Sequence, residues 1–249
     1  MLYHQVIGQG KAIVLLHGFM ENSRIWNDFV LHFSKTHQLI MIDLPGHGKS
    51  RQIDEINSME SLADNIVEIL RFLEIKKASF IGHSMGGYVS LAIGEIYPQL
   101  VEKIILVNST SLPDSYEKRE QRLKVIPTVQ RNFPLFVRLS IPMLFNDEEK
   151  SNLQEEMNYL KEIALETSIE GIEASLKGMR DRPDRTFVLY DLDIPILVIN
   201  GTKDRTINVD LFETVIPEKA NIKIVRLDCG HVAFLEKKKQ FIDTVTMFI

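Results

Sequence analysis

A serine between two closely spaced glycines is the part of this sequence best suited to covalent chemistry. Ser84 lies between Gly82 and Gly86, within the segment Phe80 to Gly87. The residues before it are apolar and the residues after it suit a helix, so the chain must turn sharply at the serine. A side chain at either glycine would collide with the tightened backbone. The pattern therefore predicts a nucleophilic hydroxyl held at a sharp turn, with the positive end of a helix dipole behind it.

A short glycine–serine pattern also arises by chance, and Ser84 would then be only the N-cap of a helix. The flanking sequence favours the nucleophile. Lys77 to Ile81 reads as a short buried strand, and Tyr88 to Ile96 continues as an apolar helix that Pro98 closes. Together they give the strand–turn–helix context that the motif requires.

A serine hydroxyl needs a base to remove its proton and an acid to orient that base. After a serine on such a turn, the expected chain order is the acid and then the histidine. Asp204 follows the apolar run Ile196 to Ile199, and His231 follows the run Ile222 to Leu227. The alternatives are a turn aspartate and a histidine at a helix start. Because all three side chains come after strand ends, we predict a catalytic triad of Ser84, His231 and Asp204.

Other polar residues near these strand ends fit the chemistry less well. His83 adjoins Ser84, so its side chain should point away from the nucleophile. His17 and His47 stand beside glycines that suit turns. Asn108 follows the run Lys103 to Val107, where an acid could otherwise stand, but an amide cannot serve as that acid.

The negative charge that develops during acyl transfer requires two preorganised donors. The backbone N–H of Met85 follows the nucleophile at the helix start. The segment Leu16 to Phe19 follows the first long apolar run, and the N–H of Phe19 is the second candidate. The alternative is that His17 and Gly18 form only a tight turn.

The rest of the chain supplies elements that can hold these residues at one edge. Short apolar runs without polar alternation suit parallel strands that are covered on both faces. They alternate with helical patterns, and this alternation predicts an α/β fold with a doubly wound, mostly parallel sheet. The opening residues, Tyr3 to Ile7, are expected to form an antiparallel edge strand. The predicted strands are 12–16, 38–42, 78–81, 103–107, 196–199 and 222–227, and the predicted helices are 26–33, 61–73, 85–96, 209–215 and 234–248.

The alternation stops between residues 112 and 186, where helical segments are broken by Pro127, Pro134 and Pro142. Thr167 to Glu170 has the capping-box pattern, which predicts that Thr167 caps the last of these helices. We predict that this insertion forms a helical cap over the carboxyl ends of the strands, and that residues 1–111 and 187–249 form the core. A separate domain is the alternative, but sequence on both sides of the insertion is needed to complete one sheet. Its apolar side chains Phe136, Met143 and Phe145 are candidates for lining an acyl pocket, or else they form the core of the cap.

Composition excludes several classes of function. The chain has 249 residues with a net charge of −5, so nucleic acid is not an expected partner. No apolar stretch reaches the roughly twenty residues needed to cross a bilayer, and no signal peptide is evident. The single cysteine, Cys229, fits a reducing compartment. We therefore expect a cytoplasmic protein that is not inserted in a membrane.

With these motifs assembled, the chain resembles the α/β-hydrolase superfamily over nearly its whole length. The resemblance implies the triad above, no cofactor, and a structural role for the loop Asp43 to Ser50. A serine nucleophile argues against the branches that use an aspartate, the haloalkane dehalogenases and epoxide hydrolases. The motifs that carry the resemblance are His17-Gly18-Phe19, Asp43 to Ser50, Gly82 to Gly87, Gly201-Thr202-Lys203-Asp204 and Gly230-His231.

The expected function is hydrolysis of a small ester or related acyl substrate, as in a carboxylesterase. One alternative is a carbon–carbon bond hydrolase or a lyase similar to those of menaquinone biosynthesis, although those lyases usually have an arginine where this chain has Tyr88. An alternative of another class is a ligand receptor on a hydrolase frame, with vestigial turnover.

Overall fold

The computed structural model describes all 249 residues and contains one seven-stranded sheet. The strands lie in the order β1-β3-β2-β4-β5-β6-β7. All neighbours are parallel except β1 and β3. The predicted doubly wound, mostly parallel sheet and its antiparallel edge strand are therefore confirmed. The strands are β1 (His4–Ile7), β2 (Lys11–Leu16), β3 (His37–Ile42), β4 (Ala78–His83), β5 (Val101–Val107), β6 (Ile196–Gly201) and β7 (Ile222–Leu227).

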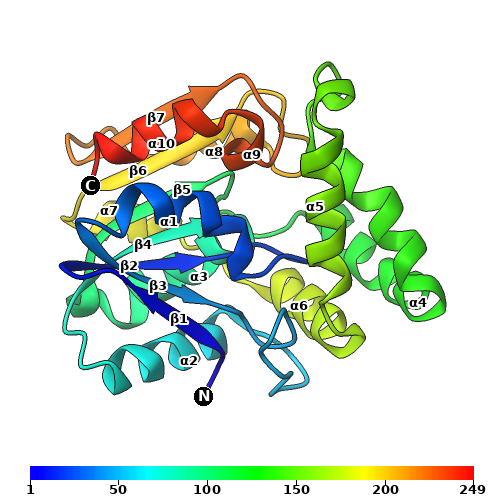
Figure 1. The fold of residues 1–249 in the computed structure, drawn as a ribbon, viewed down its shortest axis with the longest axis horizontal. Helices are drawn as coiled ribbons and strands as arrows, with labels where there is room; N and C mark the ends of the chain where they lie inside the picture. Colours follow the sequence, from blue (N-terminus) through cyan, green and yellow to red (C-terminus); the bar gives the residue numbers. More distant parts are fainter.

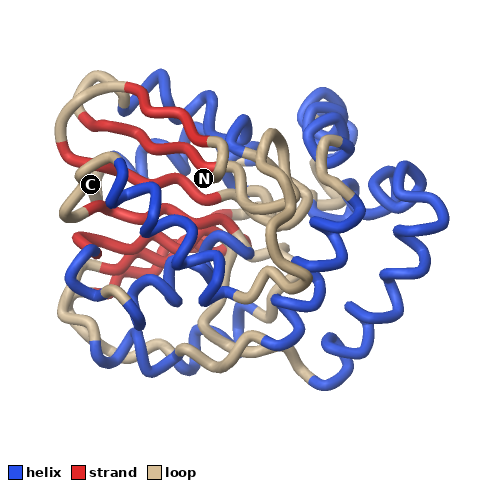
Figure 2. Tube along the Cα trace, turned by 90° about the horizontal axis from the view of Figure 1, so that it is seen from below, coloured by secondary structure: helices blue, strands red, loops and turns tan.

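The central strands are buried along their whole length because both faces of the sheet are covered. All six residues of β4 are buried, and so are all six of β6. Helices lie on both sides of the strands (Figure 2). The helices of the core are α1 (Asn27–Phe33), α2 (Met59–Phe72), α3 (Met85–Ile96), α7 (Thr186–Asp191), α8 (Val209–Val215), α9 (Ala233–Glu236) and α10 (Lys238–Thr246).

The insertion between β5 and β6 contains α4 (Tyr116–Ser140), α5 (Gln154–Leu165) and α6 (Ile169–Asp181). These helices gather at one end of the sheet (Figure 1). Two contacts tie them to loops at the carboxyl ends of strands. Ser168 donates its N–H to the carbonyl of Gly46, and His231 donates its N–H to the carbonyl of Leu144.

Three local predictions were wrong in detail. Pro127 does not break α4, which instead kinks at Asn132 (φ −158°, ψ 77°). There the amide oxygen of Asn132 accepts the N–H of Leu135 and restarts the helix, so Pro134 falls in a first turn, where proline is tolerated. The predicted final helix is two helices, separated at Lys237. The cap of α6 is Ser168 rather than Thr167, because the Ser168 side chain accepts the N–H of Gly171.

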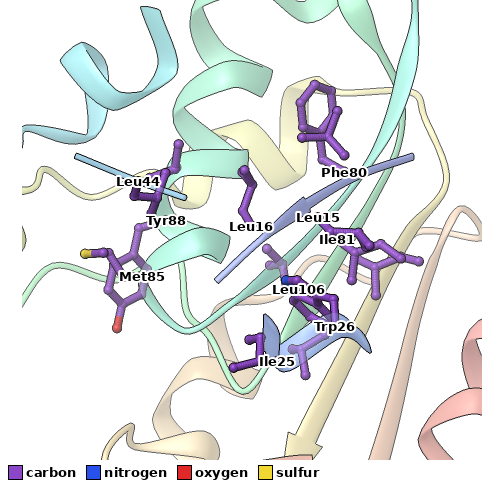
Figure 3. Close-up of a cluster of buried hydrophobic side chains, with 14 of the residues drawn as sticks. Leu15, Leu16, Ile25, Trp26, Leu44, Phe80, Ile81, Met85, Tyr88 and Leu106 are labelled. Carbon is purple, nitrogen blue, oxygen red and sulfur yellow. The ribbon is translucent and has the colours of Figure 1, made fainter. Parts of the chain in front are cut away.

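A core cluster of 64 buried residues supports the strand ends. Leu16 of β2, Ile81 of β4 and Leu106 of β5 belong to it, together with Met85 of α3 and the fully buried Trp26 (Figure 3). Because close-packed interiors resist displacement, the turn before α3 rests on a rigid base. None of the helices is both long enough and apolar enough to span a bilayer.

Candidate active site

Ser84 occupies a strained turn between β4 and α3. Its backbone has φ 48° and ψ −113°, in the positive-φ region that residues other than glycine rarely adopt. The turn is fixed from both sides, because Ser84 donates its N–H to the carbonyl of Val107 and its own carbonyl accepts the hydroxyl of Ser109 at 2.8 Å. Ser84 stands at the N-cap of α3, yet its side chain makes no capping bond. The Ser84 hydroxyl therefore makes no hydrogen bond to α3.

The glycines around Ser84 are required by close backbone approach. A Cβ atom at Gly82 would lie 2.3 Å from the carbonyl oxygen of Gly86, and one at Gly86 would lie 2.4 Å from that of Leu16. Neither contact is relieved by rotating a flexible side chain. Any larger residue would force the turn open and displace Ser84.

His231 and Asp204 form a buried pair, as their places after β7 and β6 predicted. The Nδ1 atom of His231 lies 2.7 Å from Oδ2 of Asp204, with side-chain exposures of 3% and 0%. Burial by itself raises the pKa of Asp204, but His231 and the N–H of Thr206 outweigh it and hold that pKa below its usual value. Asp204 is therefore ionised and accepts the Nδ1 proton of His231. In the neutral ring this leaves Nε2 free to act as a base.

Asn108 organises this pair instead of supplying an acid. It is fully buried at the end of β5, with φ 45°. Its amide nitrogen donates to Oδ2 of Asp204 at 3.1 Å and to the carbonyl of Gly230 at 3.0 Å. One side chain thus connects the acid to the loop that carries His231.

A second buried carboxylate fixes the His231 loop to the inserted segment. Glu236 accepts the N–H of Gly230 at 2.8 Å and the N–H of Asn146 at 2.9 Å. His231 in turn donates its N–H to the carbonyl of Leu144. The insertion therefore lies directly against the loop that holds His231.

The two predicted backbone donors lie beside Ser84. Gly18 is so close that a Cβ atom on it would lie 3.2 Å from Cβ of Ser84. Phe19 follows Gly18, and its N–H makes no hydrogen bond within the protein. Met85 is the first residue of α3, where a helix leaves its N–H groups without a partner. Both N–H groups are thus free to bind an external oxygen atom.

The pair of His83 and Glu21 is a feature that sequence reasoning missed. The Nδ1 atom of His83 lies 2.8 Å from the Glu21 carboxylate, and Nε2 lies 2.8 Å from the carbonyl oxygen of His231. Glu21 also accepts the N–H of Gly18 at 2.5 Å. This network connects the loop after β2, the turn at Ser84 and the loop of His231. The two residues are 62 positions apart, so no local pattern could have revealed the pair.

His83 carries a positive charge in this network. Neither the carbonyl nor the carboxylate can donate a hydrogen bond, so both ring nitrogens must be protonated. Burial alone lowers the pKa of His83, but the Glu21 carboxylate outweighs it and raises that pKa above its usual value. The pKa of Glu21 is correspondingly lowered by His83, against the effect of its own burial.

The two remaining histidines of this edge are neutral and structural. The Nε2 atom of His17 accepts the N–H of Leu44 at 2.9 Å, and burial lowers the pKa of His17. Burial and the neighbouring His17 lower the pKa of His47 to about 3. In the adjoining loop, the Asp43 carboxylate accepts the N–H groups of Ser23 and Lys49. These contacts give the loop Asp43 to Ser50 a structural role.

The three candidate pocket residues lie in different environments. Phe145 is buried in the core at 2% exposure, Phe136 is half-buried, and Met143 is 65% exposed. Their expected contact with substrate stays a prediction.

A cavity of about 490 Å³ lies between the start of α3, the start of α4 and the segment after Asp204. Tyr88, one turn into α3, and Thr206, next to the Asp204 loop, contribute to its wall. The protein contains no cluster of three or more His, Cys, Asp or Glu side chains suited to hold a metal ion. The one cysteine, Cys229, is buried, and burial raises its thiol pKa far above the usual value, so it is unreactive.

Comparison with known proteins agrees with this architecture. The chain is 27% identical to a pimeloyl-[acyl-carrier protein] methyl ester esterase of Wigglesworthia glossinidia brevipalpis, across 99% of this chain and 97% of that one. A thermophilic esterase from Thermogutta terrifontis, solved with malate bound, superposes with a TM-score of 0.93 at 28% identity and covers 99% and 92% of the two chains. An enol-lactonase from Burkholderia xenovorans LB400 shares the fold, with a TM-score of 0.91 at 22% identity over 99% and 95%.

The family match completes this comparison. The model of the alpha/beta hydrolase fold matches residues 11–161, which include β2, the turn at Ser84 and most of α4 and α5. Since this is more than half of its 249 residues, the chain belongs to the α/β-hydrolase fold family.

Proposed function

We propose that this protein is a serine hydrolase that cleaves a small carboxylic ester through an acyl-enzyme on Ser84. The observation that carries the proposal is the strained backbone of Ser84, whose hydroxyl makes no bond to the helix it precedes. Strain of this kind persists only where the surrounding structure imposes it. The buried pair of His231 and Asp204 is the candidate base and acid. His83, which adjoins Ser84, bonds to the carbonyl of His231 at 2.8 Å.

In the proposed mechanism, Nε2 of His231 takes the proton of Ser84 as the hydroxyl attacks the ester carbonyl. Asp204 holds the imidazole in the tautomer with its proton on Nδ1 and stabilises the imidazolium that forms. The N–H groups of Phe19 and Met85 bind the developing oxyanion. His231 then protonates the leaving alcohol. A water molecule activated by the same imidazole hydrolyses the acyl-enzyme and restores Ser84.

The names of the relatives favour ester substrates over the alternative reactions. The Wigglesworthia relative is named a methyl ester esterase and the Thermogutta structure an esterase. Both match nearly the full length of this chain, so the resemblance is not confined to the residues around Ser84.

We further propose that residues 112–186 form a cap that selects the substrate without taking part in the chemistry. Leu144 and Asn146 of this segment contact the His231 loop. A cover at that place shields the site from bulk water and limits the shape of the acyl group. Phe136, Met143 and Phe145 are the candidates for the latter role.

The test is steady-state hydrolysis of p-nitrophenyl acetate and p-nitrophenyl butyrate, with enzyme at a concentration far below that of the ester. The proposal predicts many turnovers per molecule, and a rate at the buffer level for Ser84→Ala. A single stoichiometric release of p-nitrophenol, or none, would instead favour a receptor with vestigial turnover. Ser151→Ala is a suitable control, because Ser151 is an exposed serine of the insertion and is not part of the turn at Ser84.

A further inference from the structure

The 490 Å³ cavity at the start of α3 is partly apolar and carries a local excess of positive charge. Its volume is in the usual range for small-molecule sites, about 300–1,000 Å³. Its apolar side chains can accommodate a short carbon chain. These are Tyr88, Leu112, Ile207 and Leu211.

The cavity is close to the proposed chemistry. Tyr88 donates its N–H to the carbonyl of Ser84, so it stands one helical turn, about 5.4 Å, from the nucleophile. Thr206 donates its N–H to Asp204 at 2.7 Å. A group bound between these two residues lies within reach of an ester at Ser84.

Two of the three cations in the wall already have a partner. Asp114, whose side chain is 4% exposed, pairs with both Arg122 and Arg182. Arg182 also donates to the carbonyls of Leu112 and Met179, and its guanidinium stacks on Tyr88 at 4.1 Å. These contacts give both arginines a structural role.

Lys118 is the third cation, and it forms no ion pair. It stands in the first turn of α4, where the helix dipole disfavours a positive charge. Burial lowers its pKa, and the charge of Arg122 lowers it further. The carboxylates of Asp114 and Asp204 raise the pKa of Lys118 and offset these effects only in part, so a bound anion would further favour its charged form. The only other carboxylate in the wall is that of Asp184, which is exposed and accepts the N–H of Thr186.

We infer that this cavity binds a carboxylate of the substrate, with Lys118 as its counter-charge. The inference rests on the proposed esterase function and narrows it to esters that carry a second, free carboxyl group. The apolar wall holds the intervening carbon chain. The hydroxyl of Thr206 is a further donor in the wall, next to the Asp204 loop.

The test compares esters that differ only in this carboxylate. One pair is mono-p-nitrophenyl adipate and p-nitrophenyl hexanoate, with the charge on the acyl side. The other is 4-acetoxybutyrate and butyl acetate, with the charge on the alcohol side. In one of the pairs, Lys118→Gln should lower kcat/KM for the charged ester about ten- to hundredfold and leave the neutral ester unchanged. Lys118→Arg should retain most of the preference.

Lys124→Gln is the matched control, because Lys124 is exposed on the same helix and lies outside the cavity wall. It removes the same charge and should leave both pairs unchanged. The inference is wrong if Lys118→Gln changes kcat/KM for the charged and the neutral ester equally in both pairs, or if Lys124→Gln reproduces its effect. The esterase proposal would still stand.

A binding measurement separates this inference from the function it rests on. Adipate titrated into the Ser84→Ala variant by calorimetry requires no turnover. Binding that weakens at least tenfold on adding Lys118→Gln supports the carboxylate site even if no ester is hydrolysed. If adipate does not bind, or if Lys118→Gln does not weaken its binding, the carboxylate site is wrong even if esters are hydrolysed.

Discussion

His83 and Glu21 form a buried ion pair, 2.8 Å apart, at the point where three loops of the site meet. Both side chains are 2% exposed, so water screens their interaction little. His83 reaches the His231 loop through a carbonyl, while Glu21 holds the N–H of Gly18. The pair therefore connects the loop after β2, the turn at Ser84 and the loop that carries His231.

Removing one member of the pair should destabilise the protein strongly. Glu21→Ala leaves a buried imidazolium without its partner, and we expect a loss of about 3–5 kcal/mol in the free energy of unfolding. Glu21→Gln keeps a hydrogen-bonding group of the same shape and should cost less. Urea denaturation measures both variants. Equal stability of Glu21→Ala and wild type would show that His83 is not charged.

The pair of His83 and Glu21 should also affect turnover, because it holds the loops of the site in place. For Glu21→Gln we expect kcat to fall while KM changes little, because the groups that bind substrate remain. Glu68→Gln, at an exposed carboxylate on α2, is a suitable control. A change in KM alone would place Glu21 in substrate binding instead.

Asp204→Asn should lower kcat by about 10⁴, since an amide favours the wrong tautomer of His231. His231→Ala should cost about as much as Ser84→Ala, because triad members act as a unit. Asp228→Asn is the control, because Asp228 is exposed in the loop that leads to His231. Near-normal turnover in Asp204→Asn would mean that another acid orients the base.

The buried neutral His47 should make the fold sensitive to acid. Its pKa of about 3 in the folded state lies below the ordinary value of about 6.5, so the unfolded chain binds more protons between these pH values. Stability therefore falls as the pH drops through this window. From pH 7 to pH 5 the loss through His47 is about 2 kcal/mol.

The measurement is urea denaturation of wild type and His47→Gln at both pH values. The loss in the free energy of unfolding between pH 7 and pH 5 should be about 2 kcal/mol smaller in His47→Gln than in wild type, whatever the stability of the variant at pH 7. An unchanged difference would show that His47 is not held neutral by the fold. The buried His17 contributes in the same direction in both proteins and cancels in the comparison.

The acyl-pocket prediction separates side chains that line the substrate from those that pack the cap. Alanine at Phe136, Met143 or Phe145 should alter the preferred acyl-chain length more than it alters the reaction of Ser84 with a small probe. Phe145→Ala should also lower stability by about 3–5 kcal/mol, because this side chain is buried. The measurement is a series of p-nitrophenyl esters of increasing length. Unchanged profiles in all three variants would mean that these residues only support the cap.

Much of the fold could be predicted from the sequence, because the decisive signals are local. Apolar runs such as Ile196 to Ile199 coincide with strands, and the glycines around Ser84 indicated the turn before α3. The places of Asp204 and His231 followed from the rule that parallel strands end at one edge. These features depend on a few neighbouring residues and on general topology.

The features that could not be predicted depend on contacts between distant segments. Glu21 reads as an ordinary loop acid until the fold places it against His83. Asn108 was set aside as an amide, although its two donors join Asp204 to the His231 loop. The cavity at Lys118 exists only because the start of α4 lies near the start of α3. Such roles come from tertiary packing, and a single sequence gives no local sign of them.

The most direct test of the account is to identify the residue that a fluorophosphonate probe modifies. Wild-type protein should gain the mass of one phosphonyl group, and peptide mass spectrometry should locate it on Ser84. Ser84→Ala should lose both the adduct and ester hydrolysis. An adduct on another serine, with hydrolysis intact in Ser84→Ala, would contradict the assignment of Ser84 as the nucleophile.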